Sequence, residues 1–441
     1  MKRRPLEGIR VADLSMMWAG PVATKLLGDL GAEVLKIESP SAWDNIRTLI
    51  TQPGVPEPWN SSYYFNTYNR SKKSVTLDLA QAKGREIFLD LLQHCDVLLE
   101  NYRADVLDTL QLPYDVLRAA NPNLVVVSMA GFGKTGADRA LVGFGPVIEM
   151  MSGLTSLTGY QRPGGTDAGA DTGPESDAVP YKCGVSYGDP VAGVAAAGAV
   201  MLGLLQRHRG GPAPIIDLAQ REVAATLAGS AFVAAHRQPQ PTLHGNRDPH
   251  GVAIRGAYRC QDELRQYKPS TTLPAQPIDE QWIALSVLDN NQWVSLCGLL
   301  ERPDWTDLEQ SSRQARHDEI DAVIAAWAAP QPAAEAVAVL QDRGIAASRV
   351  LDMVAVLDDP HLRARGFWTE LPHPRMPDRW RQPGPSWRLL GVDTAPRQPA
   401  PTFGEHTRQV LGDLLGLDTA ALDALAAANI IADAPINPGV G

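Results

Sequence analysis

The residue best suited to covalent chemistry is Asp189, which stands in the run Ser186-Tyr187-Gly188-Asp189-Pro190 before an alanine-rich segment. Aspartate is a preferred N-cap and proline favours the first helical position, so the run predicts a helix that Asp189 caps. One interpretation is a structural cap. The other is a nucleophile, because a helix N-terminus keeps a carboxylate ionised, a carboxylate can attack an acyl group, and Gly188 leaves room for a thioester. Backbone N–H groups there could also stabilise an oxyanion.

A second group of residues could hold an anionic, nucleotide-like ligand. Lys72, Lys73 and Arg103 lie at the edges of predicted strands, where open α/β sheets bind ligands, and such cations could pair with phosphates. Solvated surface charges are the alternative. The run from Gly131 through Gly133 to Gly136 matches the dinucleotide fingerprint as a string, but no clear helix follows it. We therefore expect a loop that faces the ligand there, and no nicotinamide or flavin site.

Composition excludes several other classes of protein. A net charge of -10 over 441 residues argues against nucleic acid binding. The sequence has no spacing of metal ligands, no G-x-S-x-G nucleophile elbow and no P-loop, so we expect no metal. No run resembles a secretory signal or approaches the length of an apolar membrane span. We expect a cytoplasmic protein that does not contact the membrane.

The elements that must position these residues read as alternating strands and helices. Helices are predicted at 19–30, around 87–92 and at 190–207, and a helix pair follows residue 406. This alternation predicts a parallel, doubly wound sheet. The predicted strands of that sheet are 9–14, 33–38, 74–79, 96–100, 123–129 and 215–218.

The middle of the chain reads differently. Residues 158–180 are rich in Gly, Pro, Asp and Thr and are expected to form a long irregular loop. A smaller α+β unit is predicted to follow, with a strand at 281–287 and helices near 293–300 and 320–327. The expected division is a large domain from 1–225, a linker at 226–244, a small domain at 245–345 and a segment at 346–441 that returns to the large domain.

Several segments together resemble class III CoA-transferases, the CaiB/BaiF-like family of formyl-CoA transferase and carnitine CoA-transferase. Each segment is weak alone, but their order and spacing over nearly the whole chain are specific. They comprise Ala19-Gly20-Pro21, 28–38, 72–79, Glu100-Asn101-Tyr102-Arg103, 121–124, 131–133, 151–154, Gly188-Asp189, Gly245-Asn246-Arg247 and 403–407.

The resemblance implies that CoA moves from an acyl-CoA donor to a free carboxylic acid through an aspartyl-CoA thioester on Asp189. It also implies CoA contacts for the residues at the strand edges, which are Lys72, Asn101, Tyr102, Arg103 and Gly133. CoA would be a substrate, with no tightly bound cofactor. The implied architecture is a Rossmann-like domain built from both chain ends, a smaller middle domain and an interlocked homodimer, with a heteromer of related subunits as the alternative.

Departures from the family pattern shape the expected acyl pocket, which includes Trp18, Phe144 and Gly188. Trp18 stands where formyl-CoA transferase has a glutamine, and Ser39 replaces an arginine, so oxalate is an unexpected acceptor and a larger, less polar acyl group is favoured. Phe144 occupies the position of the histidine of related acyl-CoA racemases, which makes a racemase the weaker alternative because phenylalanine accepts no proton. Intramolecular transfer within one diacid and a non-catalytic acyl-CoA-binding protein also remain as alternatives.

Overall fold

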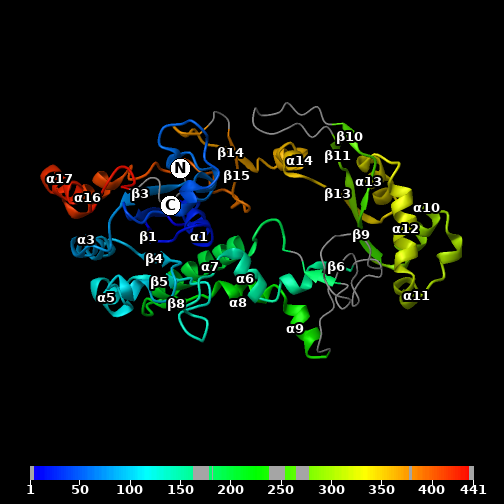
Figure 1. Ribbon diagram of the computed structural model, residues 1–441, viewed down its shortest axis with the longest axis horizontal. Coiled ribbons are helices and arrows are strands. Elements are labelled where there is room, and N and C mark those ends of the chain that lie inside the picture. Colours follow the sequence, from blue (N-terminus) through cyan, green and yellow to red (C-terminus); the bar gives the residue numbers. More distant parts are fainter. Residues whose placement is uncertain are drawn as a thin grey trace, which may run out of the picture. The chain divides into compact units, whose positions relative to one another are not determined.

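The chain folds into two compact units (Figure 1). The computed structural model describes residues 4–161, 178–180, 182–237, 254–264, 278–376 and 380–436. The larger unit comprises Met1–Thr155, Lys182–Arg237 and His361–Gly441, and the smaller one comprises Ser156–Tyr181 and Gln238–Pro360. Both ends of the chain therefore belong to the larger unit.

The larger unit is built on a six-stranded parallel sheet, which confirms the predicted α/β class. Its strand order is β3-β2-β1-β4-β5-β8, the order of a doubly wound nucleotide-binding sheet. In such a sheet the strand order reverses beside the first strand, and ligands bind at the carboxyl ends of the strands. The strands are β1 (Arg10–Asp13), β2 (Glu33–Glu38), β3 (Lys72–Thr76), β4 (Val97–Glu100), β5 (Val125–Ser128) and β8 (Ile215–Asp217).

Side chains of the central strands alternate between two cores, as a period of two residues requires. Val11 and Val97 point into one core and the adjacent Ala12 and Leu98 into the other. The first core is covered by α1 (Ala19–Asp29) and α7 (Gly188–His208), which pack closely because Gly193 of α7 has no side chain to strike Ala19. Both faces of the sheet are thus buried, which explains why the strands β4 and β5 are almost continuously apolar.

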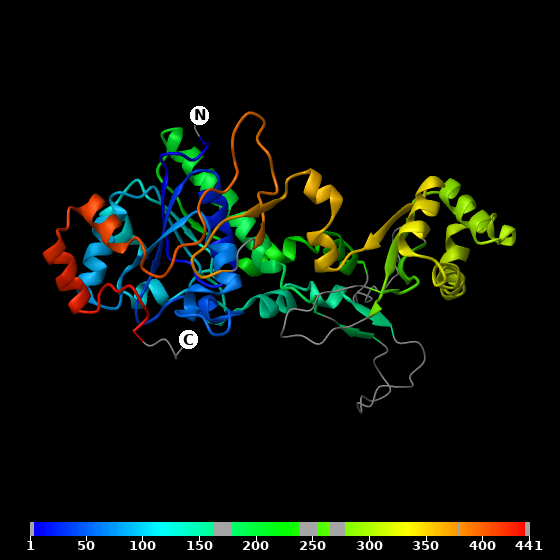
Figure 2. The same ribbon diagram turned by 90° about the horizontal axis from the view of Figure 1, so that it is seen from above.

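The second core is covered partly by the C-terminal end of the chain. The helices α16 and α17 contribute apolar side chains to the cluster that contains α3 and α5, and Figures 1 and 2 show both beside α3. The helix pair predicted after residue 406 is confirmed. The remaining helices and the strand pair of this unit are α2 (Tyr63–Tyr68), α3 (Ala82–Leu92), α4 (Val106–Thr109), α5 (Tyr114–Ala120), α6 (Gly145–Met151), α8 (Gln220–Thr226), α9 (Gly229–Ala235), β14 (Trp368–Glu370), β15 (Arg381–Pro383), α16 (Thr407–Leu415) and α17 (Thr419–Ala427).

The smaller unit contains a three-stranded antiparallel sheet of order β13-β12-β9. Its apolar core includes Trp293, Trp305 and Ile320. The elements are β9 (Ile254–Arg259), β12 (Trp282–Val287), α10 (Asn290–Leu299), α11 (Gln310–Ala315), α12 (His317–Ala328), α13 (Ala333–Asp342), β13 (Ala346–Val350) and α14 (Met353–Leu357), with the two-residue strands β10 (Glu263–Leu264) and β11 (Ile278–Asp279) and with α15 (Pro360–Ala364) at the boundary.

Three boundaries differ from those expected. Strand β13 pairs with β12, so residues after 346 still belong to the smaller unit. Helix α9 occupies 229–235 within the expected linker, and the rest of that segment beyond 237 lies outside the described residues. The ends of the expected loop pair as β6 (Gly159–Gln161) and β7 (Ala178–Pro180), while 162–177 lie outside the described residues. The Gly245-Asn246-Arg247 match also lies outside them.

Helix α7 corrects the expectation about apolar segments. At 21 residues with a mean hydropathy of 1.6, it is long and apolar enough by length and composition to cross a membrane. Its buried residues, among them Ala192, Ala196 and Val200, pack in the core beneath the sheet. That packing is typical of the core helix of a globular domain.

Candidate active site

Asp189 lies in the first turn of α7 and does not cap it. The helix begins at Gly188, and the N-cap position belongs to Tyr187, whose side chain makes no cap hydrogen bond. The prediction of a capping aspartate is therefore wrong. The reason is a neighbouring helix: Oε1 of Glu149 on α6 accepts the Gly188 N–H at 3.0 Å and so replaces a local cap.

The backbone at this helix start is not free to stabilise an oxyanion. The N–H of Gly188 donates to Glu149, that of Asp189 faces Ser186 O at 3.4 Å, and that of Val191 donates to Tyr187 O. Pro190 has no N–H. The structure thus contradicts the expectation that these N–H groups form an oxyanion hole.

The carboxylate of Asp189 rests against the start of α6. A Cβ atom added to Gly145 would lie 2.0 Å from Asp189 Oδ2 and 2.7 Å from Ser186 Cβ, so only glycine fits there. Asp189 is half-buried, and among the described residues its carboxylate forms no ion pair or hydrogen bond. Burial, together with the nearby charge of Glu149, raises the pKa of Asp189 to about 6.

An aromatic cluster reaches this carboxylate through Tyr68. Trp18 contacts Tyr68 with ring centroids 5.5 Å apart, and it meets Tyr64 edge-on at 6.1 Å. Tyr68 interacts electrostatically with Asp189, and burial raises the pKa of Tyr68 to about 12, so its phenol stays protonated at neutral pH. Trp18, which was expected in the acyl pocket, therefore packs against a tyrosine that interacts with Asp189, and the two tyrosines were not identified from the sequence.

The loop that carries Trp18 is held in an unusual conformation. Met17 has a φ of +64°, which a non-glycine residue seldom adopts. Asn101 clamps the preceding residue, because its Oδ1 accepts the Met16 N–H at 2.7 Å and its Nδ2 donates to Met16 O at 2.8 Å. Oδ1 of Asp44 accepts the Met17 N–H at 2.8 Å. Asn101, predicted to contact CoA, therefore uses its side chain to position this loop.

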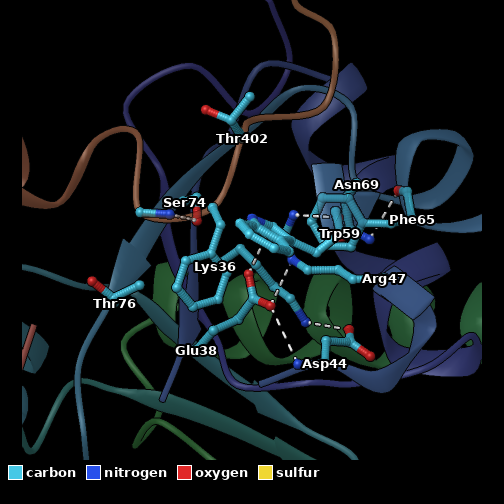
Figure 3. A network of polar contacts seen from close by, with 12 residues as sticks. Lys36, Glu38, Asp44, Arg47, Trp59, Phe65, Asn69, Ser74, Thr76 and Thr402 are labelled. Atoms are coloured by element: carbon cyan, nitrogen blue, oxygen red, sulfur yellow. Dashed lines mark hydrogen bonds and ion pairs between the residues drawn. The ribbon is translucent and has the colours of Figure 1, made fainter. Parts of the chain in front are cut away.

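A buried ionic network supports Asp44 (Figure 3). The Nζ of Lys36 lies 2.9 Å from Asp44 Oδ2 and also donates to Ser15 O, and both charged side chains are fully buried. Burial alone would lower the pKa of Lys36, but the carboxylates of Asp44, Asp13 and Glu38 outweigh burial and raise it. Arg47 pairs with Glu38 at 2.8 Å. Each of these buried charges has a partner, as buried charges require.

Lys72 belongs to the same interior and not to the surface. It is 2% exposed, and its Nζ lies 2.9 Å from Asp13 Oδ2 and 2.8 Å from Asn69 Oδ1. Although burial would raise the pKa of Asp13, the charges of Lys72 and Lys36 lower it. The ammonium group is enclosed by these partners, so the structure does not support the predicted contact between Lys72 and a phosphate.

A pocket of about 350 Å³ opens where β1, β2, β3 and β4 end. Most of its lining is apolar, and Ser39 donates to Asp78 at 3.1 Å within it. Tyr102 lines the pocket, whereas the adjacent Arg103 is exposed and forms two bonds with Asp105. The lining includes Leu14, Met16, Ile37, Ser39, Trp43, Asp44, Leu77, Asp78, Leu79, Tyr102, Val106 and Leu110.

The other predicted residues lie in different places. Gly133 has a φ of +79° and packs beside Ala219, outside the lining of this pocket. Phe144 is exposed and directly precedes α6. Gly188 is buried under Glu149. Ser39 lines the pocket at the strand ends, so the serine that replaces the arginine of formyl-CoA transferase affects the lining of that pocket.

Glu149 and Gly145 were missed by sequence reasoning. Their spacing of four residues predicts a shared helix face, but nothing in the sequence connects that face with an aspartate forty residues later. The arrangement brings together an unpaired carboxylate, a nearby cluster of aromatic rings, and a loop that leads to an apolar pocket at the sheet edge. These are the parts that an acyl transfer through a carboxylate needs.

A family model and two curated relatives all match the chain to CoA-transferases. The model of CoA-transferase family III matches residues 6–407. The chain is 28% identical to a mouse succinyl-CoA:glutarate CoA-transferase, over 97% of this chain and 90% of that protein. It is 30% identical to a succinyl-CoA–D-citramalate CoA-transferase of Chloroflexus aurantiacus, over 97% of this chain and 98% of that one.

A solved structure agrees with these sequence matches. The crystal structure of a CAIB/BAIF family protein from Brucella suis superposes with a TM-score of 0.76 at 25% identity, over 94% of this chain and all of that one. The family model spans most of the chain, and the solved structure shares its fold. The chain therefore belongs to CoA-transferase family III and is an enzyme that transfers CoA between acyl-CoA and carboxylic acids.

Proposed function

We propose that this CoA-transferase works through a covalent intermediate on Asp189. One carboxylate oxygen attacks the thioester carbonyl of the donor and expels CoA thiolate, which leaves an acyl-aspartyl anhydride. The thiolate then attacks Cγ of Asp189 and expels the donor's carboxylate, which leaves an aspartyl-CoA thioester. The acceptor carboxylate repeats both steps in reverse, and Asp189 is regenerated. No net proton, water or electron is consumed.

The observation that carries the proposal is the state of the Asp189 carboxylate. With a pKa of about 6, it is mostly ionised at neutral pH, yet it is more basic than an ordinary aspartate and therefore a better nucleophile. No described residue occupies its oxygens with an ion pair or hydrogen bond. Because Gly145 has no side chain, Oδ2 can lie against the start of α6.

We infer that the pocket at the strand ends receives the nucleotide part of CoA. Apolar side chains such as Leu77 and Trp43 suit the faces of an adenine ring, and Asp78 and Ser39 offer polar groups at the rim. Met16 lines this pocket, and Trp18, two residues later, lies beside Tyr68 near Asp189. One short loop thus joins the two parts of the proposed site.

The rings near Asp189 favour an apolar or aromatic acyl group over a small dicarboxylate. Trp18, Tyr64 and Tyr68 provide flat, weakly polar surfaces, and the charge that acts on Asp189 is the negative one of Glu149. The measurement is the rate of CoA uptake by a graded series of free acids with succinyl-CoA or acetyl-CoA as donor. Faster turnover of oxalate than of every longer apolar acid would contradict this substrate class.

We also propose that the chain acts as a homodimer. Helix α7 exposes large apolar side chains that its own unit leaves uncovered, and Leu202 is 68% exposed. The others are Val194, Met201 and Leu205. Analytical ultracentrifugation tests the proposal: a dimer is expected, and a monomer, or a stable complex only with a related chain, would contradict it.

Mass spectrometry tests the covalent step directly. After incubation with an acyl-CoA and rapid quenching, the Asp189 peptide should gain the mass of CoA less one water. The Asp189→Ala variant should gain nothing, and Glu149→Gln should still become modified. Turnover without any adduct on Asp189 would exclude the mechanism.

A further inference from the structure

Helix α6 presents two features to the reactive carboxylate from one face. Gly145, at its start, leaves the space that Asp189 Oδ2 fills, and Glu149, one turn later, is 2% exposed and accepts the Gly188 N–H. A buried carboxylate ordinarily has a cationic partner, as Asp44 and Glu38 do in this molecule. Glu149 instead faces a second carboxylate, and among the described residues no ion pair to it is found.

The other described groups around Asp189 do not balance the negative charge of Glu149. Tyr68 on α2 faces Asp189 and is a protonated phenol. Helix α1 contacts α7 at Gly193 through Ala19 and Val22, which are uncharged. On α8, Arg221 is held by Asp138 at 2.8 Å and by Met151 O at 2.9 Å. Tyr187, just before α7, lies near Glu149. The charge of Glu149 therefore acts on Asp189 without a nearby compensating cation among these groups.

We propose that Glu149 is a positioning residue for the transfer reaction, which places the start of α7 and repels the negative charge of the resting Asp189. The inference rests on the proposed covalent role of Asp189. It goes beyond that role because it assigns a function to a residue that need not touch the substrate.

The repulsion favours reaction because of what happens to the charge. In both the anhydride and the thioester, Asp189 is neutral, so forming either relieves the repulsion from Glu149. Removing the charge of Glu149 should therefore stabilise the resting enzyme more than the modified one. The lost repulsion also makes the resting carboxylate less basic and less nucleophilic.

The test compares Glu149→Gln with Glu149→Asp. Glutamine keeps an oxygen that can accept the Gly188 N–H but has no charge, whereas aspartate keeps the charge on a shorter chain. In Glu149→Gln the acid limb of kcat/KM should move to lower pH by about half a unit or more. The fraction of enzyme that carries CoA at equilibrium should fall about threefold or more. In Glu149→Asp the acid limb should stay closer to that of the wild type, although kcat falls.

Each outcome decides between the possibilities. An acid limb that is unchanged in Glu149→Gln, or that moves equally in both variants, overturns the role of charge. If Glu149→Gln does not fold, Glu149→Met, which is neutral and of similar length, must show the same shift of the limb. Absence of CoA from Asp189 in the wild type would instead refute the covalent mechanism, so the two failures are distinguishable.

Discussion

Acidic and basic groups are matched in one region of the larger unit, whereas in another region two acidic groups face each other. Around Asp44 the acidic and basic groups are matched, with Lys36 at 2.9 Å, and Arg47 on Glu38 at 2.8 Å. Around Asp189 two carboxylates face each other, and the pKa of Asp189 rises to about 6. The first region fixes the loop from Met16 to Trp18, and the second is where we place the chemistry.

The difference indicates that one region of the domain stabilises the fold and another is suited to the reaction. A matched pair lowers the energy of the folded state only when both charges are present, and it is suited to holding a strained residue such as Met17. An unmatched carboxylate costs stability but remains available to an incoming carbonyl. Substitutions in the first region should therefore damage stability, and those in the second should damage turnover.

The largest effect is expected from Asp189→Ala. Turnover should fall by at least about a thousandfold, because the proposed nucleophile is lost. Circular dichroism and thermal unfolding should show a protein that is folded as well as the wild type, since the residue is not a cap. Steady-state assays of CoA transfer measure the loss, and substantial activity in the folded variant would contradict the comparison.

Breaking the matched region should cost stability. Lys36→Met leaves Asp44 buried without its partner and should destabilise the fold by about 3 to 5 kcal/mol. The control is Lys83→Met, which removes an exposed ion pair with Glu86 and should change stability by less than about 0.5 kcal/mol. Urea unfolding measures both. Equal effects would mean that burial of the Lys36 pair does not matter.

Adding a side chain at Gly145 is expected to have a smaller effect on rate. Gly145→Ala places a methyl group where Asp189 Oδ2 now lies and should lower kcat about a hundredfold by displacing the carboxylate. Gly298→Ala is the matched control, because Gly298 lies on the exposed side of α10 with no described atom within 4 Å of the added carbon. That control should keep full activity and gain slightly in stability.

The strands and helices of the sheet domain were predicted well because residues close together in the sequence determine them. Short runs of apolar residues such as Val97 and Leu98, with Gly31 or Asn121 at helix ends, determine strand and helix within a few positions. The smaller unit's boundary was less predictable, because β13 belongs there through its pairing with β12 sixty residues earlier.

The candidate site depended on contacts between distant residues. Asp189 was identified as the candidate nucleophile, but its cap role failed because Glu149, from another helix, accepts the Gly188 N–H. Lys72 was predicted to be available to a phosphate, but Asp13, 59 residues away, encloses it. A sequence shows which residues are charged but not which residues pair with them. The pairing determines whether a charge stabilises the fold or is available for reaction.

The smallest expected effect concerns stability and pH. The pKa of Asp189 is raised from 3.8 to about 6 in the folded protein, so folding binds an extra proton between these values, and the ionised group costs stability above pH 6. Asp189→Asn should therefore stabilise the fold by about 1 to 3 kcal/mol at pH 8, and the gain should vanish near pH 4. Urea unfolding of both proteins across this range measures it. A gain that persisted at pH 4 would show that the amide stabilises the fold for a reason unrelated to charge, and a loss at pH 8 would mean that the carboxylate has a partner after all.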